Sequence, residues 1–175
     1  GTGEDNAIAP DQVALRPGIT ATLANYTSYD KGINGLMIDV QGLSGTPTLN
    51  DFLFRWGNDN KPYGNDLDNP ADDWPWAPTP TSITVRAGAG VDGADRVTLI
   101  WDDVAIQKCW LQVTVRATAN TGLVADDIFY FGNAVGESGD SSVYTIVDAT
   151  DEIGARNNQH SLFNPAPLDD LYDFN

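Results

Sequence analysis

Aromatic residues gather in and beside one polar stretch of the chain, numbers 58–80, and they are Trp56, Tyr63, Trp74 and Trp76. An exposed aromatic ring can stack on the C–H face of a sugar while nearby carboxylate and amide groups bond its hydroxyls. Asp73, which precedes Trp74, would supply such a group. These five side chains are the candidate ligand-binding residues.

Packing in the interior is the alternative for each ring. Trp56 shares a strand face with Phe52 and Phe54, which favours the core for that residue. Trp101 and Trp110 lie in strand-like runs, where large aromatic side chains usually pack, so we expect both to be buried.

Nothing in the sequence forms a catalytic pattern. Glycoside hydrolysis needs two placed carboxylates, but aspartate is so frequent here that any pair is expected by chance. The chain has one cysteine, Cys109, and one histidine, His160, and no motif places them together. A G-x-S-x-G nucleophile turn is missing as well. We therefore expect a protein that is not an enzyme and has no catalytic residues.

Charge and length narrow the class of partner. The chain has 175 residues, enough for one domain with a core, and a net charge of −16. Nucleic acids and anionic membranes are poor partners for such a chain, because both attract basic surfaces. No apolar run approaches the roughly 18 residues of a membrane span. Neutral ligands and cations remain.

The elements that would position the candidate ligand-binding residues are short runs rich in β-branched and aromatic residues, and turn residues separate these runs. The runs cover residues 19–26, 36–43, 52–56, 82–86, 96–101, 110–116 and 127–134. Val97, Leu99 and Trp101 share one face, and Leu111, Val113 and Val115 share another. The pattern predicts an all-β fold, a two-sheet antiparallel β-sandwich with a short C-terminal calcium-loop helix.

Three segments are expected. Residues 1–17 form an extended lead-in, residues 18–146 the sandwich, and residues 147–175 a helix with a loop-like tail packed on the sandwich. The helix should span 147–158, since acids occupy its first turn and Arg156 lies near its end.

The start of that helix, Asp148-Ala149-Thr150-Asp151, resembles the calcium loop and helix of a type I dockerin repeat. The resemblance implies a structural calcium ion. Asp151 matches the last ligand position, just inside the helix, and Asp148 an earlier one. Asn133 and Glu137 are the expected early ligands. Asp173-Phe174-Asn175 is similar to the opening of a second loop, so we expect a truncated repeat that does not dock onto a cohesin.

The strand region resembles non-catalytic β-sandwich modules, similar to carbohydrate-binding modules, that precede dockerin-like repeats in secreted bacterial proteins. The segments that carry the resemblance include GINGLMIDV, FLFRWGND and DIFYFGNAVGES. It implies an extracellular, secreted protein with a linked catalytic domain as its partner.

Two functions follow. The first is a carbohydrate-binding module that targets a glycan-degrading enzyme to a neutral plant polysaccharide, a β-glucan above all. The second is a structural spacer or protein-interaction module of a cell-surface protein, in which the tryptophan rings would be buried.

Overall fold

The computed structural model describes residues 3–59, 74–138 and 147–160, and most of its regular structure is β-strand. The strands are β1 (Tyr26–Thr27), β2 (Gly35–Val40), β3 (Phe52–Gly57), β4 (Ser82–Arg86), β5 (Asp95–Ile100), β6 (Trp110–Val115) and β7 (Asp127–Asn133). One α-helix, α1 (Ala149–Asn157), follows them, and several short 3-10 turns connect them.

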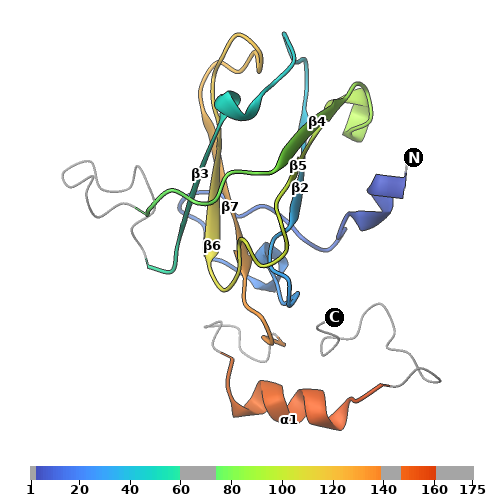
Figure 1. The fold of residues 1–175 in the computed structure, drawn as a ribbon, viewed down its shortest axis with the longest axis vertical. Coiled ribbons are helices and arrows are strands. Elements are labelled where there is room, and N and C mark those ends of the chain that lie inside the picture. The colour runs from blue at the N-terminus through green and yellow to red at the C-terminus, as the bar shows by residue number, and fades with distance from the viewer. Residues whose placement is uncertain (1–2, 60–73, 139–146, 161–175) are drawn as a thin grey trace.

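The strands form two sheets, which Figure 1 shows as two layers. Within the described residues, one sheet has the order β1-β7-β6-β3 and the other β2-β5-β4. Neighbouring strands are antiparallel except β1 and β7, which are parallel. The prediction of a wholly antiparallel fold is therefore wrong for that pair. Its two strands lie far apart in the sequence, and parallel pairing needs such a long connection.

The inner faces of both sheets share one hydrophobic core. Val97 and Leu99 of β5 and Leu111 and Val113 of β6 are all 0% exposed. Phe54 meets Trp101 edge to face, with ring centroids 5.3 Å apart, and so joins the two layers. Burying one such aliphatic side chain stabilises the fold by about 1.5–3 kcal/mol. The predicted core faces of these strands are confirmed, and the arrangement is consistent with a β-sandwich.

The predicted strand at 19–26 is wrong, while the other six are confirmed within a few residues. Residues Leu23–Asn25 form a 3-10 turn, and only Tyr26 and Thr27 pair as a strand. Asn25 Oδ1 accepts a hydrogen bond from the backbone N–H of Thr22 at 2.7 Å. Such a local side-chain bond competes with strand pairing, and propensity alone does not show it.

The N-terminal segment is attached to both sheets and is not a simple lead-in. Near its start, the carboxylate of Asp5 pairs with Arg86 and Arg96 on the three-stranded sheet at 2.6 and 3.1 Å. Further along, Leu15 exchanges two backbone hydrogen bonds with Tyr130 of β7 in the other sheet, each 2.9 Å long. The segment therefore ties the layers together.

Helix α1 is confirmed within the predicted range and lies beyond one end of the sheets (Figure 1). Asp148 caps it, since its side chain accepts a hydrogen bond from the backbone N–H of Thr150 at 2.7 Å. Arg156 in the last turn pairs with Glu152. Within the described parts of the chain, no helix has the length and apolar character that crossing a bilayer requires.

Candidate functional site

The outer face of the four-stranded sheet carries a tryptophan set between two glycines. Trp110 of β6 lies opposite Gly57 of β3 on one side and Gly132 of β7 on the other. A Cβ atom at Gly132 would stand 2.7 Å from Tyr26 Cβ and 3.2 Å from the Trp110 ring. At position 132, therefore, only glycine leaves room for the partly exposed indole of Trp110.

Trp74 lies against the second glycine, Gly57, whose missing side chain makes the close approach possible. Its ring meets Tyr130 edge to face, with centroids 6.0 Å apart. Its indole N–H donates to the carboxylate of Asp59 at 2.7 Å. Trp74 is only 6% exposed, so it is not the exposed stacking platform that its polar sequence surroundings suggested.

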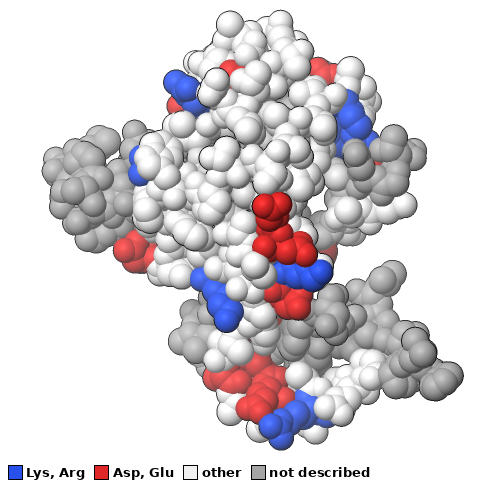
Figure 2. All heavy atoms as spheres, in the orientation of Figure 1, with Lys and Arg blue, Asp and Glu red and all other residues white. Residues whose placement is uncertain are grey.

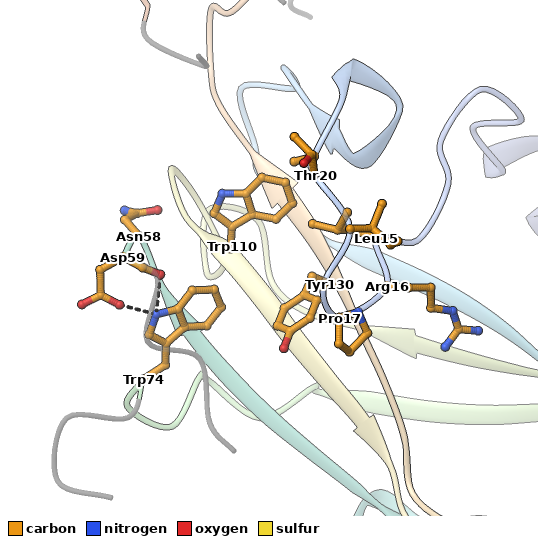
Figure 3. Close-up of a pocket in the computed structure, with 12 residues that line it drawn as sticks. Leu15, Arg16, Pro17, Thr20, Asn58, Asp59, Trp74, Trp110 and Tyr130 are labelled. Atoms are coloured by element: carbon orange, nitrogen blue, oxygen red, sulfur yellow. Dashed lines mark hydrogen bonds between the residues drawn. The ribbon is translucent and has the colours of Figure 1, made fainter. Parts of the chain in front are cut away.

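These rings border a cleft of about 540 Å³ on the outer face of the sheet. Figure 3 shows Trp74, Trp110 and Tyr130 on one side and the segment from Leu15 to Thr20 along the other. Burial raises the pKa of Tyr130 further above its ordinary value of about 10, so its hydroxyl is protonated at neutral pH.

Polar groups at the rim complement the rings. Asn58 and Asp59 are exposed, and the amide of Asn58 donates to the backbone carbonyl of Lys108 at 2.9 Å, which fixes its direction. Asp59 is the one carboxylate among the described lining residues. The cleft thus combines ring surfaces with hydrogen-bonding groups, an arrangement that suits a neutral polyhydroxylated ligand.

Trp56 and Trp76 do not line this cleft. Trp76 is 60% exposed and pairs with the edge of β3 at Arg55, whose guanidinium lies 3.6 Å from the ring centroid. Trp56 is partly buried against the core and borders a smaller hollow of about 350 Å³, which Trp74 also lines. Tyr63 and Asp73 lie outside the described residues.

Charged side chains do not form a single field on the face seen in Figure 2. Acidic and basic groups stand in small clusters, with wide uncharged surface between them. Ion pairs account for part of this pattern, for example Lys31 with Asp103 at 3.2 Å. On this face the charges of the described residues are therefore dispersed.

Asn133, an expected calcium ligand, is engaged inside the fold. Its side-chain oxygen accepts a hydrogen bond from the backbone N–H of Lys108 at 2.8 Å, and its amide donates to the carbonyls of Thr27 and Tyr29. The residue is 4% exposed. In this position it joins β7 to the loop that follows β1, and no described hydrogen bond links it to Asp148 or Asp151.

Asp151 is buried and closes the start of α1. Its Oδ1 atom accepts hydrogen bonds from the backbone N–H and the hydroxyl of Ser138 at 2.8 and 2.6 Å, and its Oδ2 atom accepts one from the Asp148 N–H. Burial alone would raise the pKa of Asp151, but these bonds hold it below its ordinary value. The hydrogen bond from the Asp148 N–H to the Asp151 carboxylate is part of the cap at the start of α1.

Glu137, which precedes Ser138, is 1% exposed. Hydrogen bonds connect Ser138, its neighbour in the sequence, to Asp151, and Asp151 to Asp148. The predicted ligands at 137, 148 and 151 are therefore linked through these bonds. Among the described residues, however, no group of three or more His, Cys, Asp or Glu side chains is arranged to hold a metal ion. Residues 139–146 lie outside the described part, so calcium stays a prediction.

Sequence reasoning missed Trp110 and Tyr130 as cleft residues. It placed Trp110 in the interior with Trp101, which is 2% exposed and donates its indole N–H to the carbonyl of Pro78. The available signal was the alternation of β6, which sends Trp110 to the face opposite Leu111. The flanking glycines come together with it only through the strand register.

Comparison with models of protein families, with curated proteins and with solved structures gives no match for this chain. Its function must therefore be argued from the site itself.

Proposed function

We propose that this chain is a carbohydrate-binding module that holds a neutral plant polysaccharide, a β-glucan, in the cleft beside Trp110. In a longer protein it would target a linked catalytic domain to that substrate outside the cell. The antiparallel β-sandwich expected from the sequence would serve as a rigid support for the binding face.

One observation carries the proposal: a partly exposed tryptophan on the outer sheet face borders a cleft that has a tyrosine hydroxyl, an amide and a carboxylate in its lining. The indole face would meet the C–H groups of one sugar ring. Asn58 and Asp59 at the rim would bond its hydroxyls. The charged residues of the described lining are Arg16 and Asp59, one of each sign, which favours a neutral chain.

The test is affinity electrophoresis of the parent and three variants in gels with soluble β-glucan, xyloglucan or an uncharged α-glucan, with pull-down on insoluble cellulose. Trp110→Ala should weaken binding about thirtyfold, since a central aromatic anchor contributes about 2 kcal/mol or more. Trp76→Ala is the matched control, because Trp76 is exposed outside the cleft. Trp110→Phe should retain part of the affinity, and circular dichroism checks that each variant folds.

Loss of binding in Trp76→Ala alone would move the site to the edge of β3. Failure of the parent protein to bind any of these glycans would refute the proposal.

A structural calcium ion at the start of α1 forms a second part of the proposal. Its support is the resemblance of the Asp148–Asp151 stretch to a dockerin loop, together with the nearby carboxylate of Glu137. Asp148 and Asp151 already cap the helix by accepting hydrogen bonds, so a cation would share their carboxylate oxygens with those bonds. The parent should melt at a lower temperature in excess chelator than in millimolar calcium, and Asp151→Ala should remove this difference. Superimposable melting curves of the parent would contradict calcium binding.

A second candidate function is a spacer or protein-interaction module. Its support is the burial of Trp74 and Trp101, which are 6% and 2% exposed and so offer little ring surface to a ligand. This function predicts no glycan retention at all, and the same electrophoresis decides between the two.

A further inference from the structure

A second hollow, of about 520 Å³, borders the same tryptophan as the first cleft, because Trp110 lines both. From the indole ring, the first cleft extends toward Tyr130 and the segment around Leu15 (Figure 3). The second hollow extends past the end of β7, where Ala134 and Val135 line it. Ligand sites in proteins have volumes of about 300–1,000 Å³. The ring of Trp110 is therefore shared by two hollows of ligand size.

The two hollows follow one another along β7. Residues two positions apart lie on the same face of a strand, so Tyr130, Gly132 and Ala134 form a row on the outer face of the four-stranded sheet. Ala134 continues the strand, since its N–H donates to the carbonyl of Thr27 in β1 at 3.0 Å. Tyr130 borders the first cleft, Ala134 borders the second hollow, and Trp110 pairs with Gly132 between them. Four residues of strand span about 13 Å, which exceeds the width of one pyranose ring, so a ligand that fills both hollows must carry several linked rings.

Exposed polar side chains border both hollows, so a ligand can reach them. Asn58 lines the first cleft and the second hollow, Asp59 lines the first cleft, and Lys108 lines the second hollow. All three side chains are exposed. The backbone of Lys108 is fixed, because its N–H donates to Asn133 Oδ1 at 2.8 Å and its carbonyl accepts from the amide of Asn58 at 2.9 Å. A ligand would meet polar groups whose supports are already in place, which lowers the entropic cost of binding.

We infer that the second hollow is a further subsite for the same glycan, so that this face binds a stretch of at least three linked sugar units. The inference rests on the carbohydrate-binding function proposed above. The middle unit would stack on Trp110. One neighbouring unit would lie in the first cleft with a hydroxyl on Asp59, and the other would lie beside Ala134 with a hydroxyl that accepts a hydrogen bond from the ammonium group of Lys108. A single sugar or a disaccharide would leave part of this surface without contacts.

The experiment is calorimetric titration of the folded chain with β-1,4-linked and β-1,3-linked gluco-oligosaccharides of two, three, four and six units. A disaccharide can cover Trp110 and one hollow, whereas a longer chain can occupy both. We expect the affinity to increase about tenfold from the disaccharide to the tetrasaccharide and then to level off. In two-dimensional amide NMR, the tetrasaccharide should cause saturable shifts at Leu15 and Tyr130 in the first cleft and at Ala134 and Val135 in the second hollow.

Lys108→Ala tests the second hollow by removing its ammonium group. The ratio of tetrasaccharide to disaccharide affinity should decrease about threefold, the loss expected for one exposed hydrogen bond. The variant should fold, because alanine keeps both backbone hydrogen bonds of position 108, and its Cβ adds no strain at a φ of 55° that lysine does not already have. Lys31→Ala is the matched control: it removes the same charge at a residue that lines neither hollow, and the ratio should not change.

The second subsite and the carbohydrate-binding function fail in different ways. A parent protein that binds neither oligosaccharides nor polysaccharides would contradict carbohydrate binding, and the second subsite with it. A disaccharide that binds as tightly as the tetrasaccharide would overturn the second subsite alone. The same conclusion would follow from shifts that do not reach Ala134 and Val135, from an equal effect of Lys108→Ala and Lys31→Ala, or from retention on polysaccharide without binding of any oligosaccharide.

Discussion

Replacing Asp51 by asparagine should lower the stability of the fold by about 2 kcal/mol at neutral pH. Asp51 ends the 3-10 turn before β3 and is 4% exposed. Its Oδ1 atom accepts a hydrogen bond from the Thr118 hydroxyl at 2.6 Å, and its Oδ2 atom accepts from Asn120 and from the backbone of Thr48. Asparagine would turn an NH₂ group toward one of these donors.

The magnitude comes from the pKa of Asp51. Burial would raise this pKa, but the hydrogen bonds from Thr118, Thr48 and Asn120 prevail and lower it from 3.8 to about 2. Each pH unit of that difference corresponds to ~1.4 kcal/mol, so the folded state favours the ionised carboxylate by about 2 kcal/mol. For a chain of this length, that equals a decrease in melting temperature of roughly 4–8 °C.

The direction of the pKa shift of Asp51 also predicts how stability depends on pH. Because the folded pKa is lowered, the contribution of Asp51 is complete above the unfolded value of 3.8 and is lost as pH falls toward about 2. Urea unfolding of the parent and of Asp51→Asn from pH 7 to pH 2 should therefore show a stability difference that shrinks below about pH 4. A difference that stays constant across this range, or equal stability at pH 7, would refute this account of Asp51.

Three further variants and one control variant test other parts of the structure. Gly132→Ala should destabilise the fold by about 1–3 kcal/mol, since its Cβ would stand 2.7 Å from Tyr26 Cβ; chemical unfolding measures this, and a neutral result would contradict the packing. Asp5→Asn should lower the melting temperature measured by calorimetry, because Arg86 and Arg96 lose their shared carboxylate, and an unchanged melt would show that the N-terminal segment is not held there. Asp151→Ala should remove helical circular dichroism signal, because Ser138 and Asp148 lose their acceptor, whereas the exposed Glu152→Ala should not. Equal signals from these two variants would contradict the capping role of Asp151.

The sheets could be predicted from the sequence because alternation is a local property. Leu111, Val113 and Val115 fall on one face of β6 whichever strands lie beside it, and the core confirms that face. The same alternation places Gln112 and Thr114 on the outer face, but both are buried, at 0% and 4% exposure. A residue is covered there only when a distant segment lies across it, and periodicity does not report such segments.

The cleft beside Trp110 could not be predicted, because its residues come together only through strand pairing and contacts with distant segments. Polar neighbours in the sequence suggested that Trp74 is exposed. Its ring instead packs against Gly57, and its indole N–H donates a hydrogen bond to Asp59. For Trp110 the outcome is the reverse. Its place in a strand predicted that it would be buried, but a cleft lies beside it, between the strand and the segment around Leu15. In both cases exposure depends on contacts between residues far apart in the chain.

Glycine placement is the feature that connects this register to the proposed function. Gly57 and Gly132 lie at the same level on the two strands that flank β6, so the indole of Trp110 has no side chain beside it in either neighbouring strand. The methyl group of an alanine at position 132 would crowd both the Trp110 ring and Tyr26. A stacking ring must be fixed before the ligand arrives if affinity is not to be lost to ordering. Close packing of the Trp110 ring at Gly132 would supply that fixation on one side, and the sheet rather than a loop would set the orientation of the proposed binding surface.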